Sequence, residues 1–159
     1  MTASSSCLTA VLALSRRARW WPGWSAMRGV SCAPVTHTSH PTWGYLLRTA
    51  TWSAAWAPEF WTFPAWAAGV DLMFAEAAGW DRPIRFAGGT GGHMPALEVA
   101  QQARRNGVHR LVFAHLGRPT LRAMDAGERP PFGEWGVPGR TYWLPRRRPA
   151  ATGHAAGGV

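Results

Sequence analysis

The segment from Gly88 to Leu116 constrains the fold of this chain more than any other part of the sequence. A glycine-rich loop leads into His93, and Pro95 follows at a position where the first turn of a helix tolerates proline. The apolar residues that come next share one helical face: Ala96, Leu97, Val99, Ala100 and Ala103. Asn106-Gly107 ends this helix, and the run Arg110–Ala114 then predicts a buried strand. Together the loop, helix and strand form one unit of an α/β fold.

Two histidines and a carboxylate lie at the ends of the predicted elements. His115 follows the predicted strand, His93 precedes the helix, and Glu76 closes another apolar run. Ligands in open α/β sheets gather beyond the carboxyl ends of strands, and a histidine there can bind a metal or act as an acid or base. A hydrogen-bonded structural role would account for the same residues, so both interpretations stay open at this point.

Further strands are expected upstream of this unit. Ser31–Thr36 is typical of a short strand, and Trp43–Thr49 with Trp52–Ala57 predicts an antiparallel pair. Phe63–Gly69 favours a short helical turn, and the apolar run Val70–Ala75 predicts a second buried strand.

Charge is distributed unevenly along the chain. The 159 residues include 17 Lys+Arg, all of them arginine, and 8 Asp+Glu, which gives a formal net charge of +9. No carboxylate precedes Glu59. A strongly basic chain suits nucleic acid as a partner, although a base bias in the coding DNA explains the arginines equally well. The 47% hydrophobic content and the 11 tryptophans exclude disorder throughout the chain.

The sequence offers no segment for crossing a membrane and no cysteine framework. The longest apolar run, Cys7–Leu14, is far shorter than the ~20 residues that span a bilayer. Cys7 and Cys32 are the only cysteines, too few for a disulfide framework or an all-cysteine zinc site. We therefore expect a cytoplasmic protein with no membrane partner.

The chain length allows one domain, which we place at residues 31–144. Residues 1–30 are atypical, because arginine and tryptophan cluster there without a helical or strand period. They could form a platform for single-stranded nucleic acid, and out-of-frame translation would explain them as well. Residues 145–159 form a basic, Ala- and Gly-rich tail that we predict to be disordered.

Four runs of the sequence carry a family resemblance. They are Asp71–Ala77, Gly92–Met94 at the start of the helix, Leu111–Leu116, and, further upstream, Ala33–His37. These runs resemble metallo-β-lactamase-fold hydrolases, in particular the branch that includes tRNA-processing ribonuclease Z. The resemblance covers about residues 31–144. It implies an α/β fold that is part of an αββα sandwich, mainly its second sheet and helix layer.

The resemblance also implies a metal site. His37 matches a ligand of the first metal ion and His115 a ligand of the second. Glu59 stands in the region where the family places a metal-bridging aspartate. Two zinc ions would be expected in complete relatives.

The same resemblance assigns residues to the reaction. His93 matches a histidine that assists protonation of the leaving group, and Glu76 matches its supporting carboxylate. Arg118 follows the metal-type His115 closely and could contact an anionic substrate. The implied activity is hydrolysis of a small-molecule ester or a nucleic-acid phosphodiester by a metal-bound hydroxide.

One family motif is missing from the sequence. The metal cluster His-x-His-x-Asp-His, which lies in the N-terminal half of these hydrolases, does not occur here. We therefore expect a truncated and impaired relative, whose uncovered apolar sheet face would allow it to oligomerise. The alternatives are a non-enzymatic, arginine-rich RNA-binding module and a gene remnant without a stable fold.

Overall fold

A computed structural model describes residues 27–37, 41–85 and 92–144 of the chain. The expectations for the tryptophan-rich N-terminal segment, for the basic tail and for most of the glycine-rich loop before His93 lie outside these described residues. Strand β1 begins at Met27, so the sheet includes a few residues that the sequence had assigned to the N-terminal segment.

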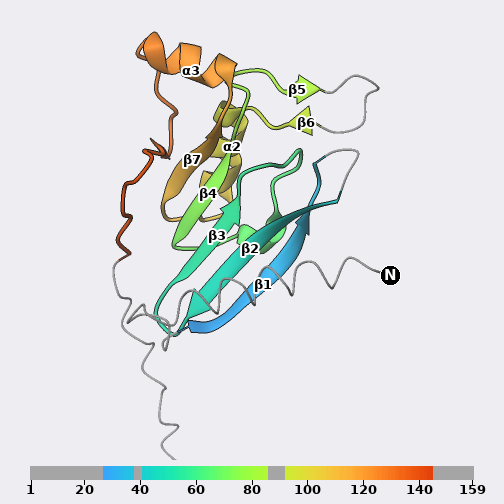
Figure 1. Cartoon of the computed structure of the whole chain (residues 1–159), viewed down its shortest axis with the longest axis vertical. Coiled ribbons are helices and arrows are strands. Elements are labelled where there is room, and N and C mark those ends of the chain that lie inside the picture. Colours follow the sequence, from blue (N-terminus) through green and yellow to red (C-terminus); the bar gives the residue numbers. More distant parts are fainter. Residues whose placement is uncertain (1–26, 38–40, 86–91, 145–159) are drawn as a thin grey trace, which may run out of the picture.

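The structure is built on one six-stranded sheet with the order β1-β2-β3-β4-β7-β8 (Figure 1). Its strands are β1 (Met27–Val35), β2 (Thr42–Thr49), β3 (Ser53–Ala57), β4 (Leu72–Ala77), β7 (Leu111–Leu116) and β8 (Glu134–Trp135). A two-stranded ribbon, β5 (Ile84–Arg85) with β6 (Gly92–His93), lies at one end of this sheet in Figure 1. The remaining elements are the short 3-10 helix Ala65–Ala67 and helices α2 (Ala96–Arg105) and α3 (Arg118–Asp125).

Strand direction brings the candidate residues to one edge of the sheet. Strand β2 is antiparallel to both β1 and β3, whereas β3, β4, β7 and β8 are mutually parallel along the sheet. The carboxyl ends of β1, β3, β4 and β7 therefore meet at the same edge. A register shift between Ala75 and Glu76 interrupts the β4–β7 ladder at this edge, and such irregularities often re-aim a side chain.

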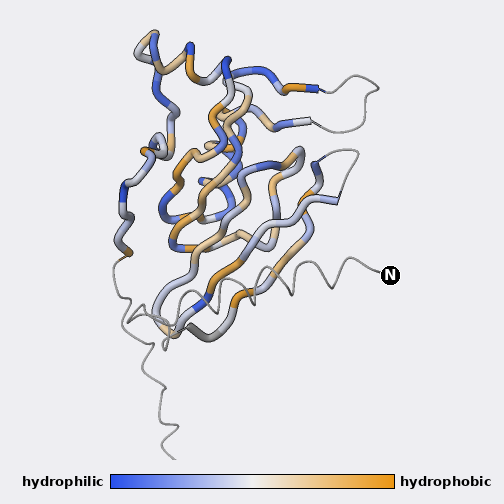
Figure 2. Tube along the Cα trace, viewed as in Figure 1, coloured by the Kyte–Doolittle hydropathy of each residue, from blue (hydrophilic) through white to orange (hydrophobic). Residues whose placement is uncertain are grey.

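Helix α2 covers one face of the sheet and forms the core with it. Its buried residues are Ala96, Val99, Ala100 and Ala103. They belong to one apolar cluster with Met73 and Ala75 of β4 and with Leu111 and Phe113 of β7. The small helical side chains allow the helix to lie close to the strands. Figure 2 shows long hydrophobic stretches along these central strands.

The other face of the sheet carries aromatic side chains with less cover. Trp56 on β3 is 43% exposed, and its ring lies 5.4 Å from that of Phe74 on β4. Tyr142, from the segment after β8, contacts Phe74 edge-on at 5.3 Å. Of the described residues, this tyrosine covers part of the face that we expected to be open, and Trp56 stays partly exposed.

Most of the predicted elements are confirmed, and the α/β class is confirmed with them. The predicted helix after Pro95, the antiparallel pair β2–β3 and the helical turn near Ala65 all form. The strand predicted at Val70–Ala75 lies two residues later, at Leu72–Ala77. The reason is Asp71, whose carboxylate accepts hydrogen bonds from the backbone and hydroxyl of Ser53 before the parallel ladder begins.

Helix α3 was not predicted from the sequence. It follows Gly117, where a side chain would collide with the carbonyl of Ala78. The Thr120 hydroxyl donates to the carbonyl of Ala77 at 2.6 Å and ties the helix to the end of β4. This contact explains why a helix with few apolar residues forms here.

Truncation of the buried aromatic core should strongly destabilise the fold. Phe113 is fully buried and packs against Trp135, so Phe113→Ala should lower the free energy of unfolding by about 3–5 kcal/mol. Leu121 on α3 is 43% exposed, and Leu121→Ala should change it by less than about 0.5 kcal/mol. Urea denaturation followed by tryptophan fluorescence measures both values. Equal losses would show that the core is not where the structure places it.

Candidate metal and acid–base centre

Five ionisable side chains converge at the carboxyl edge of the sheet. They come from five different parts of the fold: the ends of β1, β3, β4 and β7, and strand β6. In chain order they are His37, Glu59, Glu76, His93 and His115. The sequence named all five, and the structure brings all five together.

Glu76 lies at the centre of this group and is completely buried. Its Oε2 accepts a hydrogen bond from the backbone N–H of Phe60 at 3.1 Å, and its Oε1 accepts one from Ala78 at 2.8 Å. Hydrogen bonds from backbone amides favour the charged form of a buried carboxylate. The loop that follows β3 and the end of β4 therefore supply backbone hydrogen-bond donors to this carboxylate.

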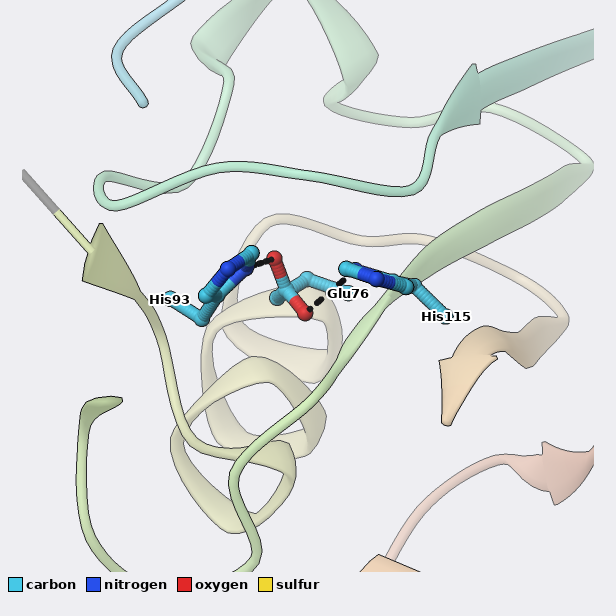
Figure 3. Close-up of side chains that lie close together, drawn as sticks. All are labelled: Glu76, His93 and His115. Carbon is cyan, nitrogen blue, oxygen red and sulfur yellow. Dashed lines mark hydrogen bonds and ion pairs between the residues drawn. The ribbon is translucent and has the colours of Figure 1, made fainter. Parts of the chain in front are cut away.

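His93 makes the shortest contact in the group. Its Nδ1 lies 2.6 Å from Oε2 of Glu76 (Figure 3). The β5–β6 ribbon positions this ring, and the amide of Gly92 donates to the carbonyl of His37 at 3.0 Å. Only glycine fits at position 92, because a side chain would collide with the carbonyl oxygen of Ile84.

His115 faces two carboxylates with its two ring nitrogens. Nδ1 is buried and lies 3.3 Å from Oε1 of Glu76, on the side opposite His93 in Figure 3. At this distance the two groups form an ion pair when the ring is protonated, and among the described residues Nδ1 makes no shorter hydrogen bond. Nε2 lies 3.8 Å from Oε1 of Glu59. The Glu76 carboxylate, aided by the charge on Glu59, raises the pKa of His115 above 6.5 against the opposing effect of burial.

His37 and Glu59 complete the cluster on its other side. Nδ1 of His37 lies 3.9 Å from Oε2 of Glu59 and 3.3 Å from the hydroxyl of Thr42. The His37 ring is 4.8 Å from the ring of His93, which is itself 5.1 Å from the ring of His115. Glu59 and His115 have side chains that are 37% and 36% exposed, so the cluster opens to solvent on their side.

One predicted site residue stays apart from this cluster, and three contributors to it were missed. Arg118 is the first residue of α3 and is exposed; among the described residues, no hydrogen bond or ion pair joins it to the five. The amides of Phe60 and Ala78 and the Thr42 hydroxyl were missed. Almost every residue type has a backbone amide, so a sequence pattern could not have identified which amides contribute.

Comparisons with known proteins find similar solved structures but no matching family model. No protein-family model matches the sequence, and no curated protein is significantly similar to it. Among solved structures, the metallo-beta-lactamase fold protein YhfI from Bacillus subtilis is similar, with a TM-score of 0.47 and 16% sequence identity. The match covers 68% of this chain and 45% of YhfI, so the chain spans less than half the length of that protein. The described helices are too short or too polar to span a bilayer.

The contact between His115 and Glu76 predicts a pH dependence of stability in metal-free protein. Folding raises the pKa of His115, so its protonated form stabilises the fold below about pH 6.5, the usual value for a free histidine. This contribution is lost as the pH rises through the raised pKa. The difference in unfolding free energy between the wild type and His115→Gln, measured with a chelator present, should be larger at about pH 5.5 than at pH 9. A difference that is the same at both pH values would contradict the assignment.

Proposed function

We propose that this chain is a relative of the metallo-β-lactamase-fold hydrolases that binds divalent metal at the five-residue cluster and hydrolyses an ester or a phosphodiester. One observation carries the proposal. The five residues that the sequence resemblance assigned to metal binding and catalysis form one continuous group of neighbouring side chains. They are 78 positions apart in sequence at the extremes, from His37 to His115.

The donor chemistry of the cluster fits a zinc ion. Imidazole nitrogens and carboxylate oxygens are ordinary zinc ligands. Glu59 directs Oε2 toward His37 and Oε1 toward His115, at 3.9 and 3.8 Å. Glu59 would hold metal together with His37 and His115, in the region where the family has a metal-binding aspartate. The open side of Glu59 leaves room for a substrate or water to approach. We therefore assign His37, Glu59 and His115 as metal ligands.

Bound zinc would supply Lewis acidity and a lowered pKa for coordinated water. The residues of this chain would supply orientation and a proton. Because Glu76 holds Nδ1 of His93 at 2.6 Å, we assign the Nδ1 proton to that contact and leave Nε2 as the nitrogen that exchanges a proton with a leaving group. Arg118, at the exposed start of α3, is our proposed contact for an anionic substrate group.

We propose that the activity is slow because the cluster offers too few protein ligands for each metal ion. Glu59 with one histidine would offer an ion two protein ligands, whereas catalytic zinc sites normally have three. We propose weak zinc binding and impaired hydrolysis for this chain, a cytoplasmic location, and self-association through the aromatic sheet face that includes Trp56.

Hydrolysis of bis(p-nitrophenyl) phosphate and of p-nitrophenyl acetate tests the proposal. We expect turnover that depends on added zinc, exceeds the rate of zinc in buffer, and disappears with a chelator. His93→Ala should lower the rate by about 100-fold or more, as for loss of a general acid. His109→Ala is the matched control, because His109 is exposed and lies before β7, at the opposite end of that strand. A rate equal to that of zinc alone, or an equal loss in both variants, would refute the proposed function.

A further inference from the structure

We propose that Glu76 is a positioning residue for His115 as well as for His93, and that it fixes the ring of His115 so that Nε2, not Nδ1, binds metal. The inference extends the proposed function, since it concerns the orientation of one of the proposed metal ligands. The family resemblance assigns Glu76 to His93 alone.

The carboxylate of Glu76 can accept only a limited number of hydrogen bonds. An ionised carboxylate offers about four lone-pair positions, two on each oxygen. On Oε2, two donors are in place: the amide of Phe60 and Nδ1 of His93. On Oε1, the amide of Ala78 takes one position at 2.8 Å. The group nearest to the last position is Nδ1 of His115, at 3.3 Å.

The two ring nitrogens of His115 have different surroundings. Nδ1 is buried, and Oε1 of Glu76 lies 3.3 Å from it. Nε2 faces the partly exposed Glu59 at 3.8 Å. A proton on Nδ1 therefore gains a carboxylate acceptor, whereas a bare Nδ1 would place a lone pair against a buried negative charge. The Nδ1-H tautomer follows, and it leaves the lone pair on Nε2.

This arrangement has the form of the carboxylate–histidine–metal relay, in which a ligating histidine donates its other N–H to a carboxylate. The 3.3 Å separation is longer than a good hydrogen bond, as is common for such contacts before the ligand or metal binds. Glu76, His93 and His115 do bring three ligand atoms within 4.8 Å of one another. With three of its lone-pair positions used by donors and the fourth facing Nδ1 of His115, however, Glu76 acts on a metal through His115 and does not coordinate it.

The first test measures the tautomer in the unmodified protein. In 15N-histidine-labelled, metal-free protein at about pH 9, where free imidazole is neutral, long-range 1H–15N correlation spectra should show His115 protonated at Nδ1. His115→Gln identifies its signals. A proton on Nε2 of His115 would overturn the proposal. This measurement needs no metal, so it stands even if the wild type fails to bind zinc, a result that would instead refute the proposed function.

The second test measures zinc affinity by competition with a chromophoric chelator. Glu76→Gln should weaken binding by about 10- to 100-fold, the usual effect of losing such a carboxylate. Glu128→Gln is the matched control, because Glu128 lies outside the cluster and accepts a hydrogen bond from Trp80 at 2.9 Å. The zinc affinity of this variant should equal that of the wild type.

Cobalt substitution separates positioning from a merely structural effect. If Glu76 positions His115, the visible spectrum of the Co²⁺-loaded protein should change in Glu76→Gln and stay unchanged in Glu128→Gln. Unchanged affinity together with an unchanged cobalt spectrum in Glu76→Gln would overturn the proposal. If Glu76→Gln does not fold, the tautomer measurement decides alone.

Discussion

The buried carboxylate of Glu76 is the group on which the arrangement of this edge of the sheet depends. A charge without water needs donors from the protein, because desolvation of an ion costs several kcal/mol. Two backbone amides and the ring of His93 supply them here, and Nδ1 of His115 lies 3.3 Å from the carboxylate. The loop after β3, the end of β4, strand β6 and strand β7 are thereby held around one point. Removing the carboxylate would leave each of these partners to find another acceptor.

The parallel strands explain how residues so distant in sequence reach this point. Because β1, β3, β4 and β7 run in one direction, each delivers the residue at or after its carboxyl end to the same edge. The register shift beside Glu76 breaks the alternation of side chains at the place where the carboxylate is needed. Helix α2, packed beneath through alanines and Val99, returns the chain from β6 to the start of β7.

Sequence patterns predicted the parts of this structure that depend on periodicity and chain direction. Helix α2 could be predicted from the sequence because its apolar face and both of its ends carry local signals. Helix α3 was not, because only Thr120 and Ala123 are buried and its position depends on the approach of Gly117 to Ala78. The five cluster residues could be named from the ends of strands and the family resemblance. Their geometry could not, because the amide of Phe60 and the two-sided environment of His115 arise only from tertiary contacts.

The Glu76 side and the Glu59 side of the cluster differ in burial and in the distances between their polar atoms. On the Glu76 side the carboxylate is fully buried and its hydrogen bonds to Ala78 and His93 are 2.8 and 2.6 Å long, so that side is suited to hold rings in place. On the Glu59 side the distances are 3.8 and 3.9 Å and the side chains are partly exposed. That side is therefore the one that solvent reaches.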